Sequence, residues 1–311
     1  MSADIAIELT RVRKAFGPRV AVNDVTLSIP KRSVFGLIGP NGAGKTTTFS
    51  LIAGYLLPSG GTVEVLGHPA RSVAALRGRL GVLPQDAILP PSERVGEFLT
   101  FLARLQGIAG RAAEAEARRV LEEVEGSAWW ALKCGALSHG MAKRVGIAQA
   151  LLGGPEVVLL DEPTAGLDPR SAWEIRQLLK ARRGTCALVV SSHNLHELEE
   201  ICDAAAILDL GRLVAAGPIH ELTASSQQIS IELAEGPTPL EALRALPLVR
   251  GVAFEADTRT LLVDFDSSSA DAETVIAEVL GLLLAQRARI SGVSKGRGLE
   301  RRVMELTGAR P

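Results

Sequence analysis

The chain has 311 residues, a length that predicts two domains, one of them large enough to bury a full α/β core. Its 47% hydrophobic and 22% charged residues are typical of a soluble globular protein, and the formal net charge of −1 argues against a nucleic-acid partner. No run reaches the ~18 to 20 consecutive apolar residues of a membrane span, so we expect a cytoplasmic chain unless another subunit holds it at a membrane.

Short apolar-rich segments near the N-terminus predict strands. They cover residues 5–9, 20–22, 25–29 and 61–65. Their spacing favours a strand-rich subdomain ahead of, and around, a core of parallel strands.

Residues 39–46 read Gly-Pro-Asn-Gly-Ala-Gly-Lys-Thr and follow an apolar run at 34–38, the order of strand, glycine-rich loop and helix start of a phosphate-binding P-loop. Glycines let the backbone curl so that successive N–H groups face phosphate oxygens, and the helix adds the positive end of its dipole. Lys45 is expected to reach the β- and γ-phosphates, and the Thr46 hydroxyl to ligate Mg²⁺. A plain turn would require neither residue, so the sequence predicts a nucleoside triphosphate site.

Residues 86–150 read mostly as helix, because apolar residues recur at helical spacing. Gln85 comes just before this region, after a short strand-like segment, where its amide would lie near a metal. Residues 137–141, Leu-Ser-His-Gly-Met, precede the helical pattern at 142–152. A serine and backbone N–H groups at a helix start predict a second anion site.

A second buried strand is predicted at residues 157–160 and ends in Asp161 and Glu162. Together with the P-loop, this pair predicts that Asp161 holds Mg²⁺, directly or through its water shell, and that Glu162 polarises the attacking water. The alternative is a strand that ends in a solvated acidic turn. A third buried strand leads to His193, which is expected to contact the same γ-phosphate.

Taken in this order, the motifs resemble those of the ATP-binding subunit of ABC transporters, and the match covers about residues 5–222. The resemblance identifies Gln85 as the Q-loop residue, residues 157–161 as the Walker B strand and His193 as the switch histidine. It also assigns ATP binding to Gln85 and to the loop residues Gly39, Pro40, Asn41, Gly42, Ala43, Gly44, Lys45, Thr46 and Thr47.

The resemblance gives roles to individual side chains. The expected catalytic residues are Glu162, His193 and Lys45. The expected Mg²⁺ ligands are Thr46, Gln85 and Asp161. Phe16, in the turn at 14–17, is assigned to stack on adenine, although tyrosine is more usual there and simple packing is the alternative.

The signature and the D-loop complete the resemblance. Ser138, His139 and Gly140 are expected to contact ATP bound to the opposite subunit, and Asp168 belongs to the D-loop. His139 and Met141 replace the third and fifth residues of the usual Leu-Ser-Gly-Gly-Gln. Because His139 adds a Cβ where glycine is common, we expect a working but altered site. The alternative is that the chain is the weaker half of a heterodimer.

The expected ABC ATP-binding domain covers residues 1–223, and a polar linker at about 224–228 separates it from an accessory domain at 229–311. The accessory domain reads as β-α-β-β-α-β, a small ferredoxin-like α+β unit. Its last segment, residues 299–307, looks like the closing helix of ATPase subunits of ABC-2 type exporters. A regulatory or dimer-stabilising role and a passive appendage both stay open.

The resemblance therefore implies a P-loop NTPase of the ABC type, with a parallel-sheet core, an N-terminal β-subdomain and a helical subdomain. It implies an ATPase that uses ATP and Mg²⁺, forms a head-to-tail homodimer or heterodimer, and powers an integral membrane permease, as in ABC-2 type exporters. The chain would lie on the cytoplasmic face of the cell membrane. An importer subunit and a soluble non-transport ABC ATPase are the alternatives, and the cargo stays open.

Overall fold

The computed structural model describes residues 4–192, 194–224, 228–266, 272–295 and 299–307. The chain divides into two compact units, residues 1–218 with 306–311, and residues 219–305. Within the described residues, no helix combines the length and the apolar character that crossing a bilayer requires.

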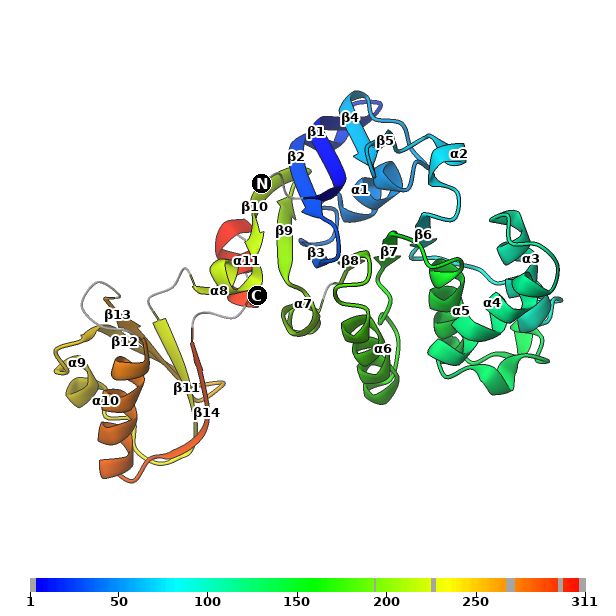
Figure 1. Ribbon diagram of the computed structural model, residues 1–311. Helices are drawn as coiled ribbons and strands as arrows, with labels where there is room; N and C mark the ends of the chain where they lie inside the picture. Colours follow the sequence, from blue (N-terminus) through cyan, green and yellow to red (C-terminus); the bar gives the residue numbers. More distant parts are fainter. Residues whose placement is uncertain (1–3, 193, 225–227, 267–271, 296–298, 308–311) are drawn as a thin grey trace. The chain divides into compact units, whose positions relative to one another are not determined.

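A six-stranded sheet forms the centre of the first unit, with the strand order β10-β9-β3-β8-β7-β6 (Figure 1). Neighbouring strands run parallel except at one edge, where β10 is antiparallel to β9. The strands are β3 (Val34–Ile38), β6 (Leu80–Leu83), β7 (Val157–Asp161), β8 (Ala187–Ser191), β9 (Ala204–Asp209) and β10 (Arg212–Pro218). Every residue of β3, β7 and β8 is buried, which explains their continuous apolar runs. The carboxyl ends of these strands meet at one edge of the sheet, where ligands bind in open α/β folds.

An antiparallel sheet, ordered β2-β1-β4-β5, forms the N-terminal β-subdomain. Its strands are β1 (Ile5–Phe16), β2 (Arg19–Pro30), β4 (Gly60–Val65) and β5 (His68–Pro69). The strands predicted at 20–22 and 25–29 are one continuous strand, β2. Between them lie the polar residues Asn23 and Asp24. The register with β1 shifts between Val25 and Val22, and Asp24 has a φ of 57°, so a local irregularity accommodates these two residues within one strand.

One hydrophobic core joins both sheets to helix α1 (Lys45–Ile52). It contains Ile7 and Leu9 of β1, Phe49 of α1 and Leu159 of β7, all at most 4% exposed. The P-loop lies between β3 and α1, and this core therefore fixes both ends of the loop.

A helical group lies beside β6 (Figure 1) and consists of α3 (Val95–Leu105), α4 (Gly110–Glu123) and α5 (His139–Leu151). In α4 the buried residues Ala113, Ala117, Val120 and Leu121 follow helical spacing, as expected for a helix that buries one face. Short helical turns complete this unit at α2 (Val73–Leu76), η1 (Ser127–Trp129) and η2 (Cys134–Ala136). Two further helices, α6 (Pro169–Ala181) and α7 (Leu195–Ile201), follow β7 and β8.

The second unit contains a four-stranded antiparallel sheet with the order β12-β13-β11-β14. Its elements are α8 (Ile219–Ala224), β11 (Gln228–Glu235), α9 (Leu240–Arg244), β12 (Val249–Glu255), β13 (Thr260–Phe265), α10 (Ala272–Ala285), β14 (Arg289–Lys295) and all but the last two residues of α11 (Leu299–Thr307). Alternate residues of β11 and β13 pack with α9 and α10 into a separate core. The order of elements from β11 to β14 is β-α-β-β-α-β, and the predicted ferredoxin-like unit is confirmed together with the α/β class of the first unit.

Candidate functional site

The P-loop follows a path that requires glycine at two positions. Gly39 has a φ of 155°, and a Cβ there would lie 2.3 Å from the carbonyl oxygen of Leu208. Gly44 has a φ of 101°, and its Cβ would lie 2.5 Å from the carbonyl oxygen of Ala21. The loop therefore packs backbone against backbone, and it brings the chain to the N-terminus of α1, where N–H groups point toward an anion.

Lys45 is folded back over this loop. Its side chain is buried, and its Nζ donates to the carbonyl oxygens of Gly39 at 2.5 Å and Pro40 at 3.2 Å. Burial lowers the pKa of the Lys45 ammonium, while the nearby carboxylates of Glu162 and Asp161 act in the opposite direction. The ammonium is thus held between the loop and the carboxylates at the end of β7.

Asp161 is the last residue of β7 and is 3% exposed. The Ser191 hydroxyl donates to its carboxylate, and the Thr46 hydroxyl is a second hydrogen-bond partner. Burial raises the pKa of Asp161, and these two hydrogen bonds oppose the rise. The structure therefore brings together two of the three predicted Mg²⁺ ligands, Thr46 and Asp161.

The oxygen atoms of Thr46 and Asp161 fit a hard cation such as Mg²⁺, which commonly binds one or two carboxylates together with phosphate oxygens. Within the described ranges, no cluster of three His, Cys, Asp or Glu side chains forms a complete metal cage.

Glu162 is 7% exposed and has a φ of 53°, in the left-handed region that non-glycine residues rarely adopt. Its backbone N–H donates to Ser191 Oγ at 2.9 Å. Ser191 thus contacts both Asp161 and Glu162, a role that the sequence analysis missed. The parallel register of β7 and β8, which pairs Asp161 with Ser191, is the signal that reveals it.

A cleft of about 350 Å³ runs along the P-loop. Its wall includes predicted ATP-binding residues, Glu162 and two residues that were not predicted from the sequence, Arg19 and Ala21. The lining residues are Phe16, Arg19, Ala21, Pro40, Asn41, Gly42, Gly44, Lys45, Thr46, Thr47, Gln85 and Glu162. The Phe16 ring is 47% exposed, and Lys14 Nζ lies 5.0 Å from its centroid. The structure therefore places an accessible aromatic ring in the same cleft as the phosphate loop.

Lys143 is a second cation that the sequence analysis missed. Its Nζ lies 3.5 Å from the carbonyl oxygen of Gln85. Burial lowers its pKa, and the carboxylates of Glu162, Asp161 and Asp86 oppose that effect. Lys143 belongs to α5, so this contact joins the helical group to the Q-loop.

The predicted signature and D-loop residues lie outside the lining of this cleft. Ser138 caps the N-terminus of α5, where its hydroxyl accepts from the backbone N–H of Met141. His139 Nε2 lies 3.4 Å from the carbonyl oxygen of Ala165, the first residue of the predicted D-loop at 165–168, so the signature contacts the D-loop of its own chain. Asp168 caps α6.

Gly140 lies in the first turn of α5, and a Cβ on it would lie 3.6 Å from Ser171 Oγ, an ordinary contact. His193 falls outside the described residues and stays a prediction from sequence.

A family model described as ABC transporter matches residues 22–165. The Nod factor export ATP-binding protein I of Paraburkholderia xenovorans (strain LB400) is 33% identical over 311 residues, which cover 98% of each chain. The linearmycin resistance ATP-binding protein LnrL of Bacillus subtilis (strain 168) is 31% identical over 309 residues, 97% of this chain and 98% of that one. A solved structure of an ATP-binding subunit of an ABC transporter is 26% identical, with a TM-score of 0.64, over 70% of this chain and 91% of its own.

These relationships confirm the predicted family, the ATP-hydrolysing activity and the predicted role as the ATPase subunit of an exporter. They agree with the geometry of the cleft, which is lined by the phosphate-binding loop, by the carboxylate of Glu162 and by the aromatic ring of Phe16. The chain belongs to the family of ATP-binding subunits of ABC transporters.

Proposed function

We propose that the P-loop cleft binds ATP together with Mg²⁺ and that hydrolysis in it drives export through a separate integral membrane permease. The observation that carries this proposal is the meeting of Thr46 with the buried Asp161 beside the ammonium of Lys45. A hydroxyl and a buried cation at the P-loop, together with a carboxylate at the end of a neighbouring buried strand, are the groups that hold a magnesium-bound triphosphate.

Each residue has a proposed part in the reaction. Lys45 and the backbone N–H groups of residues 39–47 hold the phosphate charge. Thr46, Asp161 and the side chain of Gln85 would hold Mg²⁺, which would neutralise charge on the phosphates. Glu162, on the wall of the cleft, orients the attacking water and accepts its proton, and His193 contacts the γ-phosphate. Catalysis by these groups is positioning and electrostatic stabilisation.

We propose that Phe16 stacks on the adenine ring. Its exposed position at the cleft supports this role, and the cation at Lys14 lies close enough to take part in a cation–π contact with the same ring.

The signature supports a composite site built from two subunits. Ser138, His139 and Gly140 lie at the start of α5 and take no part in the lining of their own P-loop cleft. A second ATPase subunit, identical or related, would present its P-loop to them and receive the signature in return. In this arrangement Asp168 of the D-loop would lie at the interface between the two subunits.

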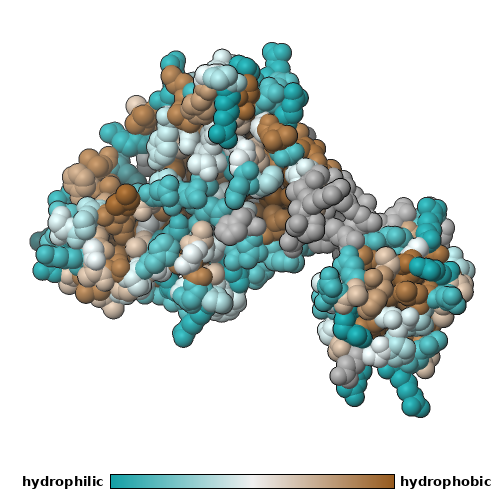
Figure 2. Space-filling model, turned by 180° about the vertical axis from the view of Figure 1, so that it is seen from behind, coloured by the Kyte–Doolittle hydropathy of each residue, from teal (hydrophilic) through white to brown (hydrophobic). Residues whose placement is uncertain are grey.

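The permease is proposed to contact the helical group. Large apolar side chains are exposed there and just before it, at Ile88, Phe101 and Leu105. Figure 2 shows brown patches over this part of the first unit, seen from behind. The permease would hold the chain at the cytoplasmic face of the membrane. We further propose domain limits of 1–223 for the ATPase and 229–311 for the accessory domain.

Replacement of Glu162 by Gln tests the proposed chemistry. Because Gln cannot accept the proton of the attacking water, turnover should fall by about 10²- to 10⁴-fold while binding of a fluorescent ATP analogue is kept. Glu156→Gln is the matched control, since Glu156 lies just before the same strand and makes an exposed ion pair with Arg79. Full turnover in Glu162→Gln would contradict the assignment.

The same variant tests the partner. We expect tagged Glu162→Gln, held with ATP and extracted from membranes in detergent, to carry an integral membrane protein that mass spectrometry identifies. Recovery of ribosomal or DNA-bound proteins instead of a membrane protein would be compatible with ATPase activity but would contradict the transport role.

A further inference from the structure

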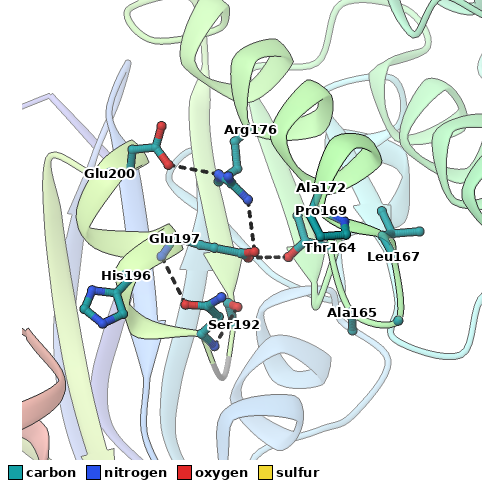
Figure 3. A pocket seen from close by; sticks show the side chains of 12 residues that line it. Thr164, Ala165, Leu167, Pro169, Ala172, Arg176, Ser192, His196, Glu197 and Glu200 are labelled. Carbon is teal, nitrogen blue, oxygen red and sulfur yellow. Dashed lines mark hydrogen bonds and ion pairs between the residues drawn. The ribbon is translucent and has the colours of Figure 1, made fainter. Parts of the chain in front are cut away.

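Three segments that follow Glu162 in the chain enclose a second hollow. They are the turn at 163–168 after β7, helix α6 and helix α7, and the hollow has a volume of about 470 Å³ (Figure 3). The turn contributes Thr164 to its lining, α6 contributes Arg176, and α7 contributes Glu197 and Glu200; Ser192 and Asn194, between β8 and α7, also line it. It is distinct from the P-loop cleft, and none of the catalytic roles given above uses its side chains.

Glu197 lies at the centre of this arrangement (Figure 3). The Thr164 hydroxyl donates to Glu197 Oε2 at 2.6 Å, and Arg176 Nη1 donates to Glu197 Oε1 at 3.0 Å. The side chain of Glu197 is 14% exposed and that of Arg176 is 16% exposed. Both carboxylate oxygens are therefore engaged in a largely buried bridge, with one partner on the turn and the other on α6.

The bridge formed by Thr164, Glu197 and Arg176 begins close in sequence to Glu162, the proposed catalytic residue. Thr164 is two residues after Glu162 and is itself buried. Glu197 is in the first turn of α7, and its backbone N–H donates to Asn194 Oδ1 at 3.4 Å. One carboxylate thus connects the segment that carries Glu162 with the start of the helix that follows β8.

The backbone of Glu162 requires support. Its φ of 53° is unfavourable for a residue with a side chain, and such conformations persist where surrounding contacts hold them. A hydrogen bond to a charged carboxylate is stronger than one between neutral groups, and it is stronger still where water is excluded. The Thr164–Glu197 bond is such a contact, and it lies two residues after Glu162.

We propose that Glu197 is a positioning residue for ATP hydrolysis, whose carboxylate holds Thr164, and with it the Glu162 segment, in register with α6 and α7. The inference rests on the proposed role of Glu162. Glu197 contacts neither nucleotide nor water in this scheme, and it acts through Thr164.

Three single variants test the proposal in the full chain. Glu197→Gln removes the charge, and Thr164→Val removes the donor while keeping the shape. Glu200→Gln is the matched control, because Glu200 lies on the same helix and accepts from Arg176 Nε at 2.9 Å but does not reach Thr164. We expect kcat for ATP to fall about tenfold or more in the first two, with KM changed less than about twofold, and to stay near wild type in the control.

Two further measurements separate positioning from folding. Thr164→Ser restores the hydroxyl and should return kcat to near the wild-type value, and thermal unfolding establishes that each variant is folded at the assay temperature. The Thr164→Val/Glu197→Gln double variant should be no slower than the worse single variant, because both remove the same contact. If Glu197→Gln does not fold, the comparison of kcat between Thr164→Val and Thr164→Ser is sufficient to test the proposal.

Wild-type kcat in both Glu197→Gln and Thr164→Val would overturn the inference, as would an equal loss in Glu200→Gln or additive losses in the double variant. Glu162→Gln is measured in parallel. If that variant keeps full turnover, the proposed function fails; if it loses turnover while the bridge variants do not, only the role of Glu197 fails.

Discussion

Replacement of Gly81 by Ala probes the contact between strand β6 and helix α5. A Cβ at Gly81 would lie 1.8 Å from the carbonyl oxygen of Ala150 and 2.8 Å from its carbonyl carbon. Gly81 does not have a positive φ, so alanine meets no backbone strain of its own there. The main effect of the substitution is therefore a collision between the new Cβ and the backbone of α5, with a lesser contact to Pro155 Cγ at 3.2 Å.

The size of the effect follows from these distances. Cβ atoms do not approach other heavy atoms within 3.0 Å, so a Cβ only 1.8 Å from the carbonyl oxygen forces β6 and the end of α5 apart. Neither side can rotate away, because the obstacle is a carbonyl group within a buried helix turn, where Ala150 and Leu151 are at most 2% exposed. Overpacking of a core costs about 1 to 3 kcal/mol, and we expect about 3 kcal/mol here.

Urea unfolding of the purified chain measures this loss. Gly146→Ala is the matched control on the other side of the same contact. Its Cβ would meet only Leu83 Cδ1, at 2.8 Å, and this is the end of a flexible side chain. Alanine also favours a helix over glycine by about 1 kcal/mol, so the control should lose little stability or gain some. A Gly81→Ala chain as stable as wild type, or less affected than Gly146→Ala, would refute the reasoning.

Two other predictions concern the charged groups of the cleft. Burial raises the pKa of Asp161 in the folded protein above its unfolded value of 3.8. As the pH rises from the unfolded to the folded pKa, ionisation of Asp161 should therefore reduce the stability of the nucleotide-free protein. Asp161→Asn should therefore unfold at a higher temperature than wild type at neutral pH, by a margin that shrinks in acid, and should lack ATPase activity; a lower melting temperature would contradict this. Lys45→Ala should lose affinity for a fluorescent ATP analogue by at least about tenfold, since a buried cation at the phosphates is removed, whereas Lys31→Ala, which breaks an exposed ion pair with Asp4, should bind as wild type does.

Much of the fold could be predicted because local sequence patterns decide it. The strands at the centre of the main sheet are buried on both faces, and their continuous apolar runs at 157–160 and 187–190 mark them directly. The P-loop could be predicted for a similar reason, since its backbone approaches other backbone at Gly39 and Gly44 and only glycine fits. The order of elements in the second unit followed from changes of hydrophobic period along the chain.

The parts that were missed depend on which strands and helices become neighbours. Ser191 acquires its role because β8 lies beside β7 in register, and no local pattern around Ser191 indicates this. Lys143 reaches Gln85 because α5 packs on β6. Arg19 joins the cleft through the turn between β1 and β2, far from the P-loop in sequence. Glu197 is the same kind of residue, because its partners are 21 and 33 positions away.

The electrostatics of the cleft connect stability with function. Lys45, Asp161 and Glu162 are each less than 9% exposed. Burial lowers the pKa of Lys45 and raises that of Asp161, and both changes favour the neutral form of the side chain. Buried charges of this kind reduce the free energy of unfolding unless other charges or hydrogen bonds compensate them. A magnesium ion would compensate the buried negative charge of Asp161, and phosphate oxygens would compensate the buried positive charge of Lys45. The same desolvation that weakens the protein without nucleotide therefore strengthens its attraction for a magnesium-bound triphosphate, because both effects arise from the low polarity around these side chains.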